Sequence, residues 1–209
     1  MDTIQKDNEN ASGIRLLVVG TESQMVYILP ADPVGSQVLA NPIELPAVPA
    51  KFVVTGIFNV EWRVFVACRD GCIYSIKNGS SRGTAVLTGS VIDPGYAVVA
   101  LARQDKTLWV ATMDRTVGSY TVRGKRTECL CMPEDIVEIC VANFNRGSVN
   151  TVLLVALSTG EIRMYSKGRA IHSFTVEKPV LSMSTGNYGR EANALVIVHG
   201  KSQALTIKL

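Results

Sequence analysis

The sequence predicts an all-β fold, a β-propeller built from consecutive four-stranded antiparallel blades. Three observations support this prediction. Short runs rich in Val, Ile, Leu, Tyr and Phe alternate with turns that contain Gly, Asn, Asp, Ser or Pro. No window keeps a helical period over three turns with a cap at each end. One strand motif recurs at intervals of 43 to 47 residues, which is the spacing of propeller blades.

The recurring motif is an apolar strand that ends in Val plus a short residue. A polar turn follows, and the next strand begins with an apolar residue seven positions after the Val. Five Val residues mark the motif, at intervals of 47, 44, 45 and 43 residues: Val19, Val66, Val110, Val155 and Val198. We expect each of them to pack between neighbouring blades. A single β-sandwich would not repeat five times in this way, and a parallel sheet would need crossover helices.

The strands follow one another along the chain in groups of three or four. Residues 1–13 are polar and are expected to form a disordered lead, and residues 14–209 form the partial propeller. The groups are 14–44 with three strands, 49–90, 96–132 and 135–176 with four each, and 180–209 with three. This gives about five blades of an incomplete ring that we expect to hold seven. We therefore expect a piece of a longer protein, or a ring that other segments complete.

Composition narrows the possible functions. A hydrophobic content of 47% and a charged content of 19% are typical of a chain with a large core. The net charge of +3 comes without a dense Lys/Arg stripe, so no nucleic-acid partner is expected. No apolar run approaches the roughly 20 residues of a membrane-spanning helix, and residues 1–13 do not resemble a signal peptide. We expect a cytoplasmic protein.

The cysteines do not predict a metal centre. Their number is odd, and they lie within or beside apolar runs, where small buried side chains are expected: Cys68, Cys72, Cys129, Cys131 and Cys140. Disulfides are not expected in the cytosol. Cys129 and Cys131 would share one face of a strand, but a zinc site needs about four ligands. No metal and no other cofactor is predicted.

The sequence also lacks a convergent catalytic set. There is no Gly-x-Ser-x-Gly motif. By the repeat alignment, His199 occupies the position that Gly20, Ala67, Ala111 and Ala156 fill in other blades, which favours a packing role. A propeller hydrolase with a site in its central channel would need acidic residues or histidines where inner strands begin, and these segments show almost none. We expect no enzyme and no catalytic residues.

Longer motifs point to one family. They are Leu16–Glu22 with Val26–Leu29, Gly56–Arg63 with Ala67–Tyr74, Gly160–Tyr165, and Gly186–Asn193. These segments resemble the propeller of the Bardet–Biedl syndrome 1 protein family, and the similarity runs from about residue 14 to the last residue.

The resemblance implies a non-enzymatic scaffold subunit of the BBSome, the coat-like complex that moves membrane proteins in and out of cilia and serves cilium assembly. The implied partners are other BBSome subunits, a GTP-bound Arf-like small GTPase and ciliary membrane-protein cargo. Membrane contact would be indirect, through the complex. The implied locations are the cytoplasm, the cilium, the ciliary membrane and the basal body. The alternative is a generic propeller scaffold in another trafficking or coat complex.

The resemblance also implies where the GTPase docks, since in this family it binds the terminal blades. The last blade carries the segment Gly186–Glu191, in which two glycines would allow close approach of the backbone. Tyr188 offers amphipathic contact area, Arg190 can form a bidentate ion pair, and Glu191 completes the candidate partner-binding set. The alternative is an ordinary strand connection with Tyr188 packed down and Arg190 solvated.

Overall fold

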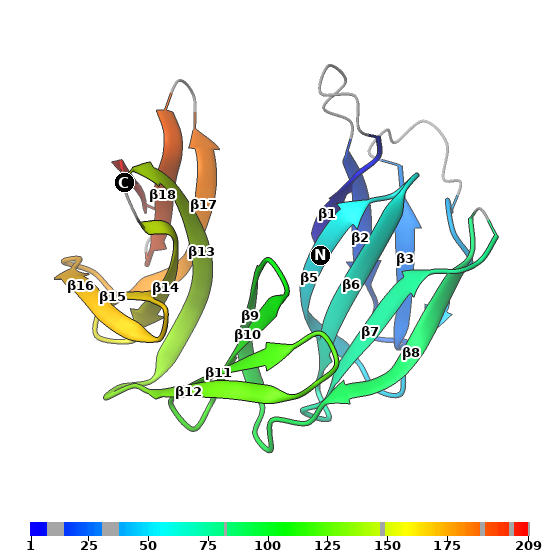
Figure 1. The fold of residues 1–209 in the computed structure, drawn as a ribbon, viewed down its shortest axis with the longest axis horizontal. Coiled ribbons are helices and arrows are strands. Elements are labelled where there is room, and N and C mark those ends of the chain that lie inside the picture. The colour runs from blue at the N-terminus through cyan, green and yellow to red at the C-terminus, as the bar shows by residue number, and fades with distance from the viewer. Residues whose placement is uncertain are drawn as a thin grey trace. The chain divides into compact units, whose positions relative to one another are not determined.

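A computed structural model describes residues 1–7, 15–30, 38–81, 83–146, 149–188, 191–200 and 203–208. The described residues form 19 β-strands (Figure 1). None of the described segments contains a helix that is long and apolar enough to cross a membrane. The chain divides into two compact units, Met1–Val98 and Val99–Leu209.

The first unit contains two groups of four strands. Blade 1 consists of β1 (Asp2–Gln5), β2 (Arg15–Gly20), β3 (Met25–Leu29) and β4 (Ile43–Glu44). Blade 2 consists of β5 (Pro49–Ile57), β6 (Glu61–Cys68), β7 (Ile73–Asn78) and β8 (Ala85–Ile92). Within each blade the consecutive strands pair antiparallel. The two blades meet where Gln5 of β1 pairs in parallel with Ile57 of β5.

The remaining strands form three further blades, which begin at the boundary between the two units. Blade 3 consists of β9 (Val98–Gln104), β10 (Thr107–Thr112), β11 (Thr116–Thr121) and β12 (Arg126–Cys131). Blade 4 consists of β13 (Ile136–Arg146), β14 (Val149–Leu157), β15 (Glu161–Ser166) and β16 (Arg169–Thr175). Blade 5 consists of β17 (Val180–Tyr188), β18 (Glu191–His199) and β19 (Gln203–Lys208). In the sheets of blades 3, 4 and 5, strands that follow each other in sequence are neighbours.

Strand β1 corrects the expectation of a disordered lead. Asp2–Gln5 pair with β2, and the side chain of Ile4 is 1% exposed, within the core of the first unit. Asp2 Oδ2 also accepts a hydrogen bond from the backbone N–H of Val54, at 3.0 Å. Only one apolar residue in four marks this strand, so the sequence pattern does not reveal it. Residues 8–14 lie outside the described part of the chain.

The core of the second unit explains why β14 carries an unbroken apolar run over residues 152–157. In β14, Leu153, Val155 and Leu157 pack in one cluster with residues of blade 3. The alternating residues Val152, Leu154 and Ala156 pack in another cluster with residues of blade 5. Because successive side chains of a strand point to opposite faces, a strand buried on both faces needs an unbroken apolar run.

The marker Val residues are buried in the middle of the repeat and less so at its ends. Val66, Val110 and Val155 are at most 1% exposed, as expected. Val19 is half-buried and Val198 is 36% exposed, so the expectation is wrong for Val198. In blade 5, the face of β18 that packs on blade 4 instead carries Leu195 and Ile197.

The pairing register explains why Val198 is exposed while the marker Val residues of the middle blades are buried. In blades 1 to 4 each marker Val pairs with the residue eight positions later, as Val66 does with Tyr74 and Val155 with Arg163. In blade 5 the pair that is eight residues apart is Ile197 with Leu205. The last repeat is therefore aligned one residue too late in the sequence pattern. Val198, not His199, occupies the position of Ala67 and Ala156.

A backbone feature follows the same repeat. The residue five positions after the marker Val has a positive φ in each of four turns: 65° at Gln24, 86° at Gly71, 64° at Arg115 and 88° at Gly160. This conformation favours glycine, yet two blades use a larger residue.

The strand order and pairing confirm the all-β class and the four-stranded antiparallel blades. The number of blades in a complete ring stays a prediction.

Candidate partner-docking surface

The sequence-predicted contact residues lie at the hairpin that joins β17 to β18. Tyr188 ends β17, Glu191 begins β18, and the two residues pair directly. Arg190 and the side chains of Tyr188 and Glu191 lie outside the described residues. The backbone therefore places two of the three candidates opposite each other.

Gly186 does not play the part expected of it. It lies inside β17, paired with Ala194, and not in the connection. A Cβ built at this position meets nothing within 4 Å. The absence of a side chain at Gly186 is therefore not required by any described neighbour, and the argument from close backbone approach fails at this residue.

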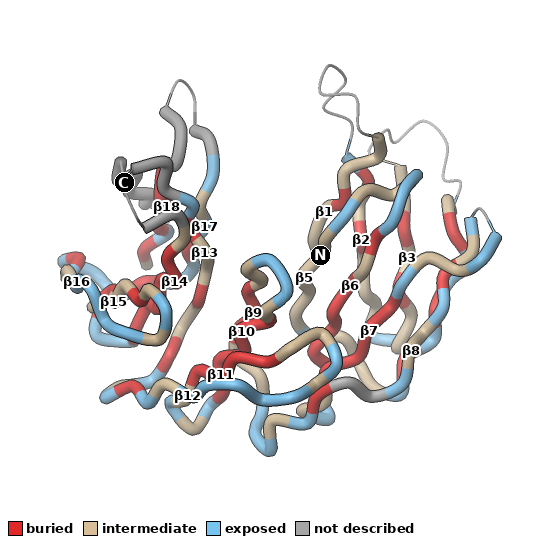
Figure 2. The backbone as a smooth tube through the Cα atoms, viewed as in Figure 1, coloured by how far each residue is buried: buried red, intermediate tan, exposed pale blue. Residues whose placement is uncertain are grey.

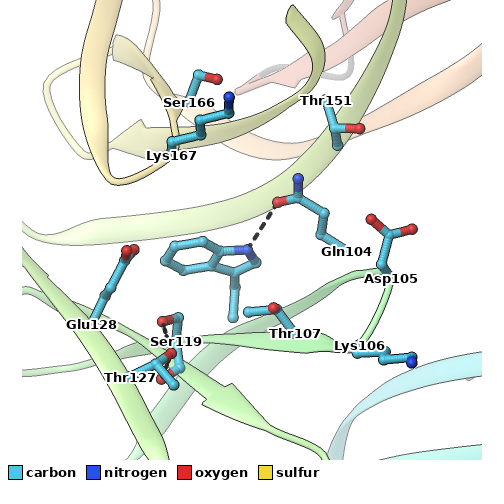
Figure 3. Close-up of a pocket in the computed structure, with 11 residues that line it drawn as sticks. Gln104, Asp105, Lys106, Thr107, Ser119, Thr127, Glu128, Thr151, Ser166 and Lys167 are labelled. Carbon is cyan, nitrogen blue, oxygen red and sulfur yellow. Dashed lines mark hydrogen bonds between the residues drawn. The ribbon is translucent and has the colours of Figure 1, made fainter.

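A groove of about 580 Å³ lies between blades 3 and 4, inside the second unit (Figure 3). Eleven residues line it: Gln104, Asp105, Lys106, Thr107, Trp109, Ser119, Thr127, Glu128, Thr151, Ser166 and Lys167. They come from both turns and strands of two successive repeats. For this reason no contiguous motif marked the groove in the sequence.

The indole of Trp109 is the one large apolar group among the residues that line the groove, and it is mostly buried. Its Nε1–H donates to Oε1 of Gln104 at 3.3 Å, which satisfies the donor while Trp109 is only 6% exposed (Figure 3). Ser119 and Thr127 form a hydroxyl–hydroxyl hydrogen bond of 2.6 Å beside it. An aromatic surface with nearby hydroxyl and amide groups is typical of sites that orient a polar ligand or a peptide segment.

Charges of both signs border this groove. Asp105 and Lys106 come from the β9–β10 turn, Glu128 from β12, and Lys167 from the β15–β16 turn. A Cβ built on Gly168 would lie 3.0 Å from Glu128 Oε2, so the carboxylate lies against that turn. Two acidic and two basic residues cancel, and the groove therefore does not select a ligand by net charge.

The β6–β7 turn holds a cluster of titratable groups. Asp70 accepts hydrogen bonds from the hydroxyl of Tyr74 at 2.7 Å and from the backbone N–H of Cys72 at 3.0 Å. The bond to Asp70, with burial, raises the pKa of Tyr74 well above its usual range. Burial, together with Asp70 and Cys72, raises the pKa of Cys68 to about 12. The Cys68 thiol and the Tyr74 hydroxyl therefore stay protonated at neutral pH, and neither supplies a nucleophile.

The two histidines do not meet. His172 is exposed on β16 and its ring lies 6.4 Å from that of Phe174. His199 is 6% exposed, and no described group pairs with its Nδ1. Among the described residues, no group of three or more His, Cys, Asp or Glu side chains could hold a metal ion.

Comparison with known proteins relates the chain to one family. Residues 1–77 match the family described as Ciliary BBSome complex subunit 1. The BBSome complex member BBS1 of mouse is 30% identical over 203 residues, which cover 94% of this chain, and the human protein is 29% identical over the same length. The chain spans 32% of the length of these curated relatives.

Solved structures show the same relationship. Two crystal structures of BBS1N in complex with ARL6DN match the whole chain, with TM-scores of 0.83 and 0.84 and identities of 33% and 32%, and the match covers 64% of BBS1N. The match to the computationally designed Ika8 protein covers 99% of this chain and 57% of the Ika8 chain, with a TM-score of 0.65 and 15% identity. At this identity, the match indicates a similar fold and nothing more.

Proposed function

Because this chain is related over its length to the N-terminal region of BBSome subunit 1, we propose that it is a propeller scaffold of that complex. In this role it docks a GTP-bound Arf-like small GTPase and serves ciliary membrane-protein trafficking. The observation that carries the proposal is the match of the whole chain to BBS1N, which was crystallised in complex with ARL6DN.

The GTPase contact is proposed at the β17–β18 hairpin, through Tyr188, Arg190 and Glu191. The backbones of Tyr188 and Glu191 are paired across the hairpin, which brings these two positions of blade 5 together. An aromatic ring with an acidic and a basic residue beside it is the composition of many interface hot spots. Arg190 would supply the bidentate partner for a carboxylate of the GTPase.

The remaining partners follow from the same proposal. The blades carry polar, solvated outer strands and a mixed-charge groove, and these surfaces suit contacts with other BBSome subunits and with cargo. We propose no catalysis and no nucleic-acid binding for this chain. We place it in the cytoplasm and at the cilium, including the ciliary membrane and basal body, with membrane contact through the complex.

Nucleotide-dependent binding tests this function. The 209-residue chain is immobilised and mixed with an Arf-like GTPase of the ARL6 type, loaded either with a non-hydrolysable GTP analogue or with GDP. We expect at least tenfold more of the GTP-analogue form to be retained. A Ras-type GTPase in the same two states is the control and should not be retained. Equal retention of the two nucleotide states, or none of either by a folded chain, would overturn the proposal.

A further inference from the structure

Two of the five cysteines are exposed, against the expectation that all of them are small buried side chains. Cys129 and Cys131 lie on β12, the outermost strand of blade 3, and both are exposed. Figure 2 shows the contrast between the exposed β12 and the neighbouring buried β11. The other three thiols, including Cys68, are buried or half-buried. The exposed pair therefore offers the accessible thiol chemistry of the described chain.

The two exposed thiols lie on one face of a regular stretch of strand. Cys129 pairs with Gly118 and Cys131 with Thr116, without a register shift between them. Residues two apart in a strand point to the same side and are separated by about 6.6 Å along it. The intervening Leu130 points to the opposite face, where it packs with the core.

This separation decides what the pair can form. A disulfide needs Cβ atoms about 3.8 Å apart, so two parallel side chains in a straight strand do not reach it. An ion bound between two sulfurs at about 2.3 Å each needs sulfurs only about 4.6 Å apart. Side chains about 6.6 Å apart at their base reach that distance by leaning toward each other. The geometry therefore favours a bridging ion over an intrachain disulfide.

Arg126 supplies a second, independent observation. Its guanidinium donates a hydrogen bond to Sγ of Cys129. This hydrogen bond places a positive charge beside one of the two exposed sulfurs. Two thiolates around a monovalent cation leave one net negative charge, which this guanidinium can balance. A divalent ion would leave no charge to balance.

The number of ligands limits the choice of metal. No group of three or more metal-binding side chains occurs in the described residues, so a closed tetrahedral zinc site is not formed by them. Two thiolates suit a soft cation that accepts two ligands, and Cu(I) is the soft, thiolate-selective ion of this charge. We propose that Cys129 and Cys131 form a two-thiolate site for Cu(I). On binding, two S–Cu bonds form, each thiol releases its proton to solvent, and no electron is transferred.

A competition titration tests the site. The 209-residue chain is titrated anaerobically with Cu(I) in the presence of a chromophoric Cu(I) chelator, which reports the copper that the protein takes. We expect one Cu(I) per chain, and at least a tenfold loss of affinity in each of Cys129→Ser and Cys131→Ser. Arg126→Ala should weaken binding severalfold. Cys72→Ser and Arg123→Ala are the matched controls and should bind as the unmodified chain does.

Three results would overturn the proposal. The first is an unmodified chain that takes Cu(I) from the chelator no better than Cys129→Ser does. The second is a loss of Cu(I) affinity in Cys72→Ser equal to that in Cys129→Ser. The third is one Cu(I) per two chains with a dimer in sedimentation, because the ion would then be shared between copies. Both cysteines are exposed, so the serine variants should keep the circular dichroism spectrum and the melting temperature of the unmodified chain.

Discussion

Arg69 and Glu22 form an ion pair of 2.7 Å between Nη2 and Oε1, although they are 47 residues apart in the chain. Each lies three residues after the marker Val of its blade, Val66 and Val19. The two side chains therefore occupy the same position in successive repeats. Blades 1 and 2 are joined at this rim by equivalent turns whose residues have opposite charge.

We expect this ion pair to contribute little to stability. Its side chains are 63% and 75% exposed, and exposed pairs contribute about 0–1 kcal/mol. Arg69→Ala should lower the free energy of unfolding by less than about 1 kcal/mol, and 1 M salt should abolish the difference. A double-mutant cycle with Glu22→Ala in urea measures the coupling. A coupling above 2 kcal/mol would contradict this account.

The positive φ at this turn position predicts that two substitutions change stability by different amounts. At Gly160, φ is 88° and an added Cβ would lie 2.8 Å from the backbone oxygen of Val176, so Gly160→Ala should cost about 1–3 kcal/mol of stability. Gln24 has the equivalent conformation with a side chain present, and Gln24→Gly should be neutral within about 0.5 kcal/mol or slightly stabilising. Urea denaturation of the two variants checks both. A stable Gly160→Ala chain would argue against strain at this position.

The spacing of the marker Val residues predicted the fold because the same apolar strand recurs in successive blades. The pattern reports where apolar strands lie and how often they recur, and this was enough to predict β2 to β19. It failed where local registers differ by one residue, as at Ile197 and Val198, because either residue satisfies the apolar pattern. It also failed at β1, where pairing with β2 and β5 orders a segment with a single buried apolar side chain, Ile4.

The marker Val residues differ in burial, so truncating a buried one and an exposed one should change stability by different amounts. Val155 is completely buried between blades 3 and 4, and Val155→Ala should lower the free energy of unfolding by about 1–3 kcal/mol. Val198 is 36% exposed, so Val198→Ala should cost less than about 1 kcal/mol. Thermal and urea denaturation measure the difference. Equal costs would mean that the last repeat follows the register of the sequence alignment after all.

The candidate docking surfaces were less predictable than the fold. The groove around Trp109 gathers side chains from positions between 104 and 167, and only the packing of blade 4 on blade 3 brings them together. The exposure of Cys129 and Cys131 depends on β12 being an outermost strand, which periodicity does not reveal. The hairpin residues Tyr188 and Glu191 could be placed near a turn from the sequence, although Gly186 itself lies inside β17.

Stability should fall at alkaline pH because two thiols resist ionisation in the folded chain. Burial, with a smaller contribution from Glu138, raises the pKa of Cys140 from 9.0 to about 12, and burial raises that of Cys68 by the same amount. Above pH 9 the unfolded chain releases these protons while the folded chain keeps them. The free energy of unfolding should therefore fall between about pH 9 and 12. This decline should be smaller in Cys140→Ala.

Urea titrations at pH 7, 9 and 11 measure that decline. Cys140→Ala is compared with Cys129→Ser, which changes an exposed thiol and should leave the slope of stability against pH as it is in the unmodified chain. The same slope in Cys140→Ala and the unmodified chain would show that this thiol is not the cause.

The proposed GTPase contact leads to a prediction for Arg190. If its guanidinium pairs with a carboxylate of the GTPase, Arg190→Glu replaces an attraction by a repulsion at the interface. Binding of the GTP-loaded form should weaken by about 2 kcal/mol or more, roughly thirtyfold. Surface plasmon resonance with the GTP-loaded GTPase measures this change.

The matched control is Arg123→Glu, which reverses an exposed charge in the β11–β12 turn of blade 3 and should leave GTPase binding unchanged. The melting temperature of both variants should stay that of the unmodified chain. Unchanged binding by Arg190→Glu would remove the β17–β18 hairpin as the docking site while leaving nucleotide-dependent docking elsewhere on the chain possible.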